Sequence, residues 1–275
     1  MRRGCGALLW GALFASFLCV GVPARAADDA EPADARAIVA RAWANLFGRN
    51  SIERVEIRAS RPDSKEFLRT AQVIRRGTRD GELNRMLVRF VGSGELRGVS
   101  LLLLEGPNFE YDAFLFQPAL HRTRRISVAQ RRDAFFGTDV FFEDLEAKRA
   151  AQWNERLLRT ESVLGRPAWV IEIEPAGLPS GYERVVIWFD QALPVMLRAE
   201  FHRGGRQIKS FEVDPARIES RDGFQVPLAT TFRGENGSVT EVVITEIEFR
   251  DALPDRLFSP ESLEFSDERQ DLKIK

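Results

Sequence analysis

Most of the chain after residue 50 alternates between apolar and polar positions, which is the pattern of β-strands with one buried face. The segment before it has helical spacing instead, with apolar residues that recur on one stripe. The residues of this stripe are Val39, Trp43, Leu46 and Phe47. Asp34 stands where it can cap such a helix, and Gly48 stands where the helix can end. We therefore expect one helix followed by a long series of strands.

Twelve segments show strand-like patterning, and turn residues such as Glu235-Asn236-Gly237 separate them. The segments are 51–59, 65–76, 83–91, 99–105, 109–116, 156–164, 168–175, 182–190, 194–203, 206–214, 224–234 and 238–253. Connections this short favour antiparallel hairpins. Late in the chain, Ser259-Pro260-Glu261 predicts a single helical turn. The sequence thus predicts about eleven or twelve strands in a mainly β (α+β) fold, without internal repeats and as one domain over 27–275.

Two strands are apolar on both of their faces, namely Leu101–Leu104 and Val185–Phe189. A sheet with one solvent-exposed face would show alternating apolar and polar residues in these strands. Another element must therefore cover the second face. A helical lid on the concave side of a curved sheet is one such cover. In the last segment, the alternation is irregular between Val239 and Glu246 and becomes regular only at Ile247 and Glu248.

The N-terminus has the features of a secretory signal peptide, with Arg2 and Arg3, an apolar run over 7–22 and the A-x-A motif at 24–26. We expect cleavage before Ala27 and export. A membrane anchor fits less well, because sixteen apolar residues are fewer than the roughly 20 of a span. A lipoprotein signal at Cys19 and twin-arginine export lack their usual neighbouring residues.

Removal of this signal changes the chemistry that the chain can offer. Both cysteines, Cys5 and Cys19, lie within it, so the mature protein would have no disulfide, no thiolate nucleophile and no cysteine metal site. The mature chain would hold 37 basic and 41 acidic residues. This balance gives no reason to expect a nucleic acid as a partner.

Candidates for catalysis are few, and we expect no enzyme, no cofactor and no metal. The two histidines, His121 and His202, lack the spacing of zinc ligands. His202 is expected at a solvated hairpin end, whereas His121 with a nearby carboxylate is the one hydrolase candidate. The chain has neither a G-x-S-x-G motif nor a phosphate-binding glycine loop. A calcium site at Asp139, Glu143 and Asp144 does not match the spacing of an EF-hand.

The stretch from His121 to Leu145 combines charge and aromatic rings more densely than any other. Five arginines precede four phenylalanines and an acidic end. Arg124 and Arg125 could form a rim that meets anionic head groups or a partner protein. They could instead form internal salt bridges with Asp133, Asp139 or Asp144. The sequence favours these internal salt bridges over the rim, and both alternatives stay open. Phe135, Phe136, Phe141 and Phe142 should turn inward and plug one end of the sheet, with a bend at Gly137.

A series of motifs through this stretch and beyond carries a family resemblance. They are Pro118, Arg124-Arg125-Ile126-Ser127, Phe136-Gly137-Thr138-Asp139, Glu143-Asp144-Leu145, Tyr182 with 185–190, Ile208-Lys209-Ser210 and 258–263. In this order, the chain resembles the outer-membrane lipoprotein-sorting protein family, periplasmic proteins related to the lipoprotein carrier LolA. It departs from the family pattern at Tyr111–Phe114.

The resemblance implies a LolA/LolB-like half-open antiparallel β-barrel of about eleven strands, with the N-terminal helix and short central helices as a lid. It implies a periplasmic monomer that carries lipid or lipoprotein acyl chains toward the outer membrane. The candidate cavity residues are Trp43, Phe47, Leu101, Leu103, Phe136, Phe141 and Ile187. The alternative is a non-catalytic accessory protein that docks to an inner-membrane transporter through a rim of Arg124, Arg125 and Asp139.

Overall fold

The computed structural model describes residues 34–149, 152–177 and 179–264, which belong to one compact unit that begins at Ala33. The expected signal peptide and its cleavage site lie outside the described residues. None of the helices in the described part of the chain is both long enough and apolar enough to cross a membrane.

The expected helix is present as α1 (Ala35–Phe47), and Asp34 caps it by accepting a hydrogen bond from the backbone N–H of Arg36 at 3.0 Å. Val39, Trp43 and Phe47 are buried as the stripe predicts, but Leu46 is 41% exposed. The predicted turn after Ser259 is also present, because the side chain of Ser259 accepts a hydrogen bond from the backbone N–H of Ser262. The first and last elements were thus predictable from their capping residues.

The described residues contain fifteen strands, so the expected count of about eleven or twelve was too low. They are β1 (Asn50–Arg61), β2 (Ser64–Arg76), β3 (Arg85–Val91), β4 (Ser100–Glu105), β5 (Tyr111–Gln117), β6 (Arg122–Ile126), β7 (Trp153–Val163), β8 (Arg166–Pro175), β9 (Arg184–Asp190), β10 (Met196–Arg203), β11 (Arg206–Val213), β12 (Ile218–Arg221), β13 (Phe224–Pro227), β14 (Ala229–Gly234) and β15 (Val239–Arg250). The polar strands β6 and β12 give little hydrophobic signal. The segment 224–234 divides into β13 and β14 at Pro227.

Only short 3₁₀ helices stand where the central lid helices were expected. The 3₁₀ helices that lie wholly within the described residues are η1 (Arg79–Gly81), η2 (Pro118–Leu120), η3 (Val128–Arg132), η4 (Phe135–Gly137), η5 (Phe142–Leu145), η7 (Pro215–Arg217), η8 (Asp255–Phe258) and η9 (Pro260–Leu263). Three of them, η3 to η5, lie in residues 127–149, which we call the central segment. Its charged and aromatic residues therefore form tight turns and no α-helix.

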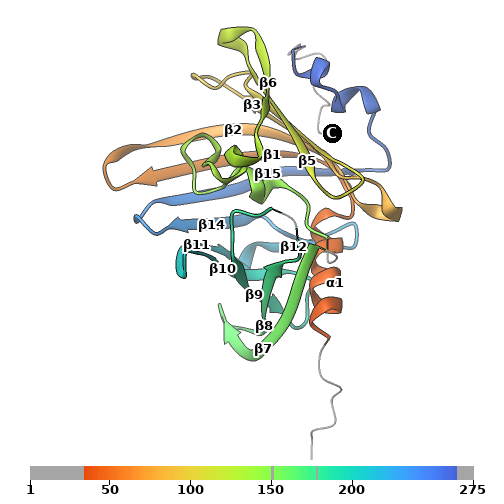
Figure 1. The fold of residues 1–275 in the computed structure, drawn as a ribbon, viewed down its shortest axis with the longest axis vertical. Helices are drawn as coiled ribbons and strands as arrows, with labels where there is room; N and C mark the ends of the chain where they lie inside the picture. Colours follow the sequence, from red (N-terminus) through yellow and green to blue (C-terminus); the bar gives the residue numbers. More distant parts are fainter. Residues whose placement is uncertain (1–33, 150–151, 178, 265–275) are drawn as a thin grey trace, which may run out of the picture. The chain divides into compact units, whose positions relative to one another are not determined.

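Thirteen strands form one antiparallel sheet in the order β6-β5-β4-β3-β2-β1-β15-β14-β11-β10-β9-β8-β7 (Figure 1). The sheet is open, because β6 and β7 stand at its two ends, and β12 and β13 form a separate hairpin. The central segment leads from β6 toward β7 and passes over one face of the sheet. We call this the inner face, and α1 packs beside the segment against β7, β9 and β13.

The double apolar character of β4 has a direct explanation. Leu101 and Leu103 point to the inner face, where they pack with Phe135 and Phe142 of the central segment. Leu102 points to the outer face, in a cluster with Phe258 and other residues of η8 and η9. We call η8 and η9 (Asp255–Leu263) the C-terminal segment. This segment is the second cover that the sequence required, and it lies on the outer face. The central segment covers the inner face.

Candidate functional site

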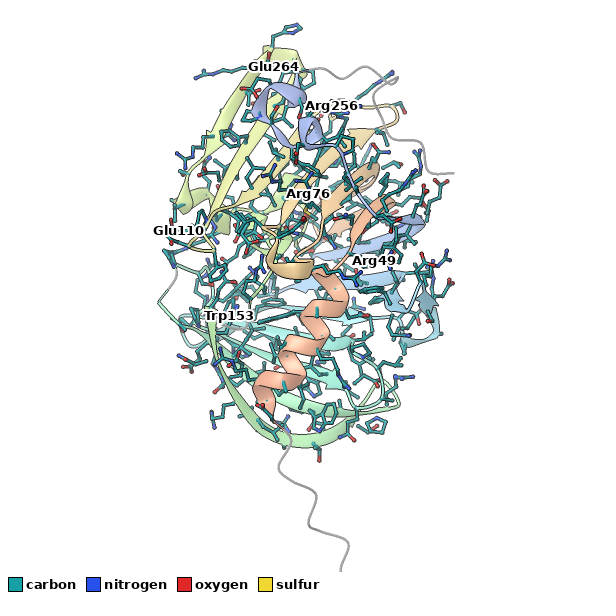
Figure 2. All side chains as sticks on the ribbon, turned by 90° about the vertical axis from the view of Figure 1, so that its right-hand side faces the viewer. Arg49, Arg76, Glu110, Trp153, Arg256 and Glu264 are labelled. Carbon is teal, nitrogen blue, oxygen red and sulfur yellow. The ribbon has the colours of Figure 1, made fainter. Side chains whose placement is uncertain are left out.

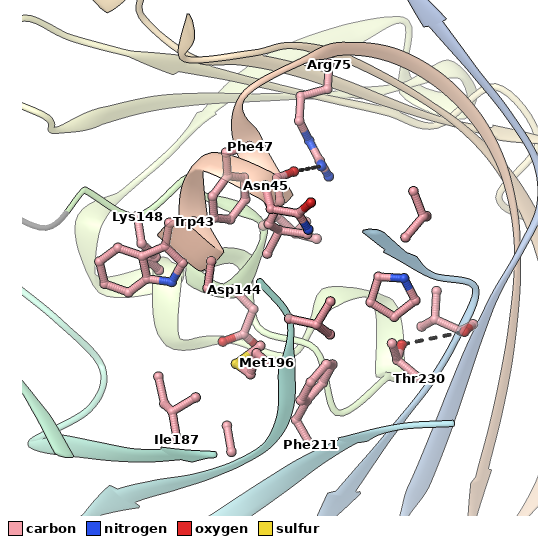
Figure 3. A pocket seen from close by; sticks show the side chains of 18 of the residues that line it. Trp43, Asn45, Phe47, Arg75, Asp144, Lys148, Ile187, Met196, Phe211 and Thr230 are labelled. Carbon is pink, nitrogen blue, oxygen red and sulfur yellow. Dashed lines mark hydrogen bonds between the residues drawn. The ribbon is translucent and has the colours of Figure 1, made fainter. Parts of the chain in front are cut away.

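We call the strands from β6 to β1 in the sheet order the first half of the sheet and those from β15 to β7 its second half. An apolar cavity of about 340 Å³ lies on the inner face, between α1 and the strands of the second half (Figure 3). Helix α1 provides Trp43 and Phe47, and β9 provides Val185 and Ile187. The other apolar side chains of its wall include Met86, Val140, Leu145, Trp153, Ile173, Val195, Met196, Phe201, Phe211, Val226, Phe232, Val242, Ile244, Ile247 and Phe249. Its volume falls within the range of about 300–1,000 Å³ that is usual for small-molecule sites.

A second compartment of about 160 Å³ adjoins this cavity beneath the central segment. The two share wall residues, among them Met86, Val140, Val242 and Ile244. The smaller compartment ends at Phe135 and Thr138, which the central segment places over β1 and β2. The two compartments therefore adjoin each other on the inner face.

A β-bulge sets which residues of β15 reach the cavity. Arg54 pairs with Glu246 and Val55 with Ile244, so that no residue of β1 lies opposite Thr245 in the strand register. Because of this extra residue, Val242 and Ile244 before the bulge face the same side as Ile247 and Phe249 after it. The irregular alternation in the sequence is the signal of this bulge, although the predicted cavity residues include none from β15.

Five charged side chains stand in the mainly apolar wall of the cavity, namely Arg49, Glu53, Arg75, Asp144 and Lys148. Two of them, Glu53 and Arg75, also line the second compartment. Arg75 Nη1 lies 4.0 Å from Glu53 Oε1 and donates to the carbonyl oxygen of Leu46 at 3.3 Å (Figure 3). Ser51 Oγ donates to the same Glu53 oxygen at 2.7 Å. This pairing lets Arg75 and Glu53 line both compartments without an uncompensated charge.

Helix α1 is fixed at its C-terminal end, where it forms the wall of the cavity. Asn45 Nδ2 donates to the carbonyl oxygen of Gln225, and the N–H of Gln225 donates back to Asn45 Oδ1, both at 2.8 Å. The N–H of Thr78 donates to the carbonyl oxygen of Phe47 at 2.8 Å. Leu46, the partly exposed residue of the stripe, lines the cavity at this end of α1. Apolar surface is therefore open to solvent at the edge of the cavity.

Three carboxylates fasten the central segment to the second half of the sheet. Asp139 accepts hydrogen bonds from Ser238 and Thr240 at the β14–β15 hairpin. Glu143 accepts from the N–H of Gly181 at 2.6 Å and from the hydroxyl of Ser180. In the described residues, no group of three or more His, Cys, Asp or Glu side chains could hold a metal ion. These acidic residues instead satisfy buried polar groups of the fold.

The third carboxylate, Asp144, forms a buried ion pair with Lys209 of β11. It also accepts a hydrogen bond from Tyr182 Oη at 2.6 Å and from its own segment's Phe141 N–H at 2.7 Å. The ammonium of Lys209 is surrounded by aromatic rings, with centroids at 3.9 Å for Phe141 and 4.8 Å for Phe201. Burial lowers the pKa of Lys209 and Asp144 opposes that change, while burial and the Asp144 charge raise the pKa of Tyr182.

The predicted cavity residues divide into three groups. Trp43, Phe47 and Ile187 line the cavity. Leu101 and Leu103 are fully buried in the core beneath the central segment and do not line it. Neither Phe136 nor Phe141 lines it either.

The four phenylalanines of the central segment do not plug one end of the sheet together. Phe135 and Phe136 pack on Phe90 of β3. The ring centroid of Phe90 lies 5.6 Å from that of Phe135 and 5.3 Å from that of Phe136. Phe142 packs on Phe135. Phe141 instead stacks on Tyr182 at 6.1 Å, on the other half of the sheet. The segment therefore bridges the two halves, with the expected bend at Gly137 (φ 81°).

The salt-bridge set expected for the arginine-rich stretch was wrong in its partners. Arg125 pairs with Asp112 on the neighbouring strand β5, and Arg124 donates to Gln130 Oε1 at 3.3 Å. Asp139 is distant from these contacts because it bonds to the β14–β15 hairpin. The cause is that β6 is an end strand, where each arginine meets its strand neighbour or the turn that follows.

One of the two histidines differs from expectation. His202 is not solvated, since its side chain is 12% exposed, and burial together with Arg184 lowers its pKa. His121 ends the turn η2 with a left-handed backbone (φ 44°). Neither histidine lines the cavity.

Comparison with known proteins places the fold. A family model described as "uncharacterized protein" matches residues 82–265, and no curated protein sequence matches the chain. A putative outer membrane lipoprotein-sorting protein domain from Vibrio parahaemolyticus superimposes with a TM-score of 0.77 at 22% identity, over 84% of this chain and 98% of that one. A DUF1329 family protein from Desulfovibrio piger gives 0.76 at 21%, over 83% and 97%.

A LolA superfamily protein from Nitrosomonas europaea gives a TM-score of 0.67 at 25% identity, over 84% of this chain and 99% of that one. The three likenesses extend over nearly the whole of each solved structure, so the overall fold is shared. The chain therefore belongs to the family of the matching model, and its fold is that of outer membrane lipoprotein-sorting and LolA superfamily proteins.

Proposed function

We propose that this protein is a periplasmic carrier that holds lipid or lipoprotein acyl chains in the inner-face cavity and delivers them toward the outer membrane. The observation that carries the proposal is the pair of adjoining apolar compartments beneath α1 and the central segment, which share wall residues. Two of the similar structures support it by their names, one as a lipoprotein-sorting domain and one as a member of the LolA superfamily.

The physical task of such a carrier is to keep hydrocarbon out of water. Each buried CH₂ group contributes about 0.8 kcal/mol, so a chain of about sixteen carbons represents on the order of 12 kcal/mol. A dry cavity removes most of this penalty and needs no nucleophile. The apolar wall and the absence of both histidines from it agree with that requirement.

An alternative role uses the other end of the sheet. Strand β6 is an end strand, and its Arg125 side chain is 67% exposed, so this edge offers cations to a partner such as an inner-membrane transporter. A pull-down that compares the wild type with the Arg124→Glu/Arg125→Glu double variant tests this role. Equal recovery of one partner by both proteins would reject docking through β6.

Val242→Asp is expected to weaken the binding of a fluorescent fatty acid to delipidated protein by at least about tenfold. The new carboxylate would stand in the wall shared by both compartments, where it must either remain charged next to hydrocarbon or take up a proton. Titration by fluorescence measures the dissociation constant, and thermal melting of the same samples shows whether the variant is folded.

The matched control is Leu68→Asp, which adds the same charge at an exposed apolar residue (56% exposed) that lines neither compartment. It should bind as the wild type does. Thr230→Trp provides a second test, because it adds bulk to the shared wall without a charge. The carrier proposal is rejected if folded wild-type protein shows no saturable binding of any acyl chain.

A further inference from the structure

A second hollow, of polar character and about 370 Å³, lies where α1 ends and β1 begins. We call it the arginine cleft. Its lining residues are Gly48, Arg49, Asn50, Arg76, Gly77, Arg79, Glu82, Arg250, Asp251, Ala252, Leu253 and Asp255. Figure 2 labels Arg49 and Arg76 close to the C-terminal end of α1. Four arginines and three carboxylates thus meet in one place beside the apolar cavity.

Arg49 is the residue that the arginine cleft shares with the apolar cavity. Its guanidinium carbon lies 5.2 Å from the ring centroids of both Phe224 and Phe249. Phe249 itself lines the apolar cavity. The two rings hold a cation at the boundary between an apolar space and a polar one, which fixes the guanidinium before any ligand arrives.

Most of the other charges in the arginine cleft have partners. Arg76 pairs with Asp255 at 2.5 Å and donates to the carbonyl oxygen of Leu253 at 2.8 Å. Arg250 pairs with Glu248 at 2.9 Å. Arg49, by contrast, forms its two ring contacts and no hydrogen bond or ion pair with the described residues. Its N–H donors are therefore available to a ligand.

We propose, on the basis of the carrier function above, that the cargo is an amphiphile with an anionic head group. The acyl chain occupies the apolar cavity, and the head group reaches the arginine cleft, where Arg49 binds it. The planar guanidinium matches the geometry of a carboxylate or a phosphate, both of which can accept two parallel hydrogen bonds. A neutral head group would gain no charge-assisted contact at this position.

The test compares amphiphiles of one chain length by calorimetry on delipidated protein. The ligands are palmitate, palmitoyl lysophosphatidate and monopalmitoylglycerol, which carry a carboxylate, a phosphate and no charge. Arg49→Gln is expected to weaken the binding of the anionic ligands about tenfold and to leave the neutral ligand unchanged. Added salt should weaken anionic binding alone. The two anionic arms show whether a carboxylate or a phosphate is preferred.

Arg206→Gln is the matched control, because Arg206 is 74% exposed on the β10–β11 hairpin and lines neither hollow. It should bind all three ligands as the wild type does. If Arg49→Gln binds palmitate and lysophosphatidate as tightly as the wild type does, the head-group inference is overturned and the carrier function stands. If the wild type binds none of the three, both are overturned.

Discussion

Lys209→Ala is expected to lower the free energy of unfolding by about 3–5 kcal/mol, the usual loss when one partner of a buried ion pair is removed. The ammonium is nearly inaccessible and pairs with Asp144, which has little contact with water. Without it, the Asp144 carboxylate would remain buried among aromatic rings. The hydrogen bonds from Tyr182 and from the Phe141 N–H would remain, which places the expected loss toward the lower end of this range.

Urea unfolding measures this loss. The same substitution should speed hydrogen exchange at amides of the central segment, because Lys209 connects β11 both to Asp144 and to the carbonyl oxygen of Asp139. Arg206→Ala removes an exposed cation at the start of the same strand, β11, and should change stability by no more than about 0.5 kcal/mol. A loss below about 1 kcal/mol for Lys209→Ala would show that the ion pair does not hold the segment in place.

Phe258→Ala is the second substitution with a large expected effect, a loss of about 3–5 kcal/mol of unfolding free energy. The ring is buried on the outer face with Ile74, Leu87 and Leu102, and the guanidinium of Arg76 lies 5.0 Å from it. Its removal leaves a void between the C-terminal segment and the sheet. Because this cluster is on the opposite face from the cavity, affinity for acyl chains should change little in the folded protein.

Two measurements separate these consequences, namely urea unfolding for stability and fatty-acid titration for affinity at a temperature where the variant is folded. Leu120→Ala, at an exposed apolar residue, is the control and should affect neither. If Phe258→Ala keeps the stability of the wild type, the C-terminal segment is not a cover of the sheet. A large change in affinity would show instead that the outer face influences the cavity.

The two substitutions probe the two layers that make β4 apolar on both faces. Leu101 and Leu103 meet the central segment, and Leu102 meets the C-terminal segment. The sheet is thus covered on both sides in its first half. In its second half, α1 covers the inner face and leaves space beside it, which is why the cavity opens there.

Local patterns in the sequence determined much of the fold. Apolar stripes, capping residues and turn residues depend on near neighbours along the chain, so they predicted α1, most strands and the turn at Ser259. The order of motifs around Phe136–Asp139 and Glu143–Leu145 pointed to the fold that the structural comparison confirms. The two-sided apolar strand also required a second cover, although it did not say which segment provides it.

The tertiary structure alone decided the partners and the cavity. Alternation along a strand separates two faces, yet it does not say which face is inner, and the bulge at Thr245 reverses the assignment within β15. Leu103 and Ile187 look equivalent in sequence, but one is packed under the central segment and the other lines the cavity. The partners of Asp144 and Arg125 likewise depended on which distant strands lie side by side, and a local pattern carries no such information.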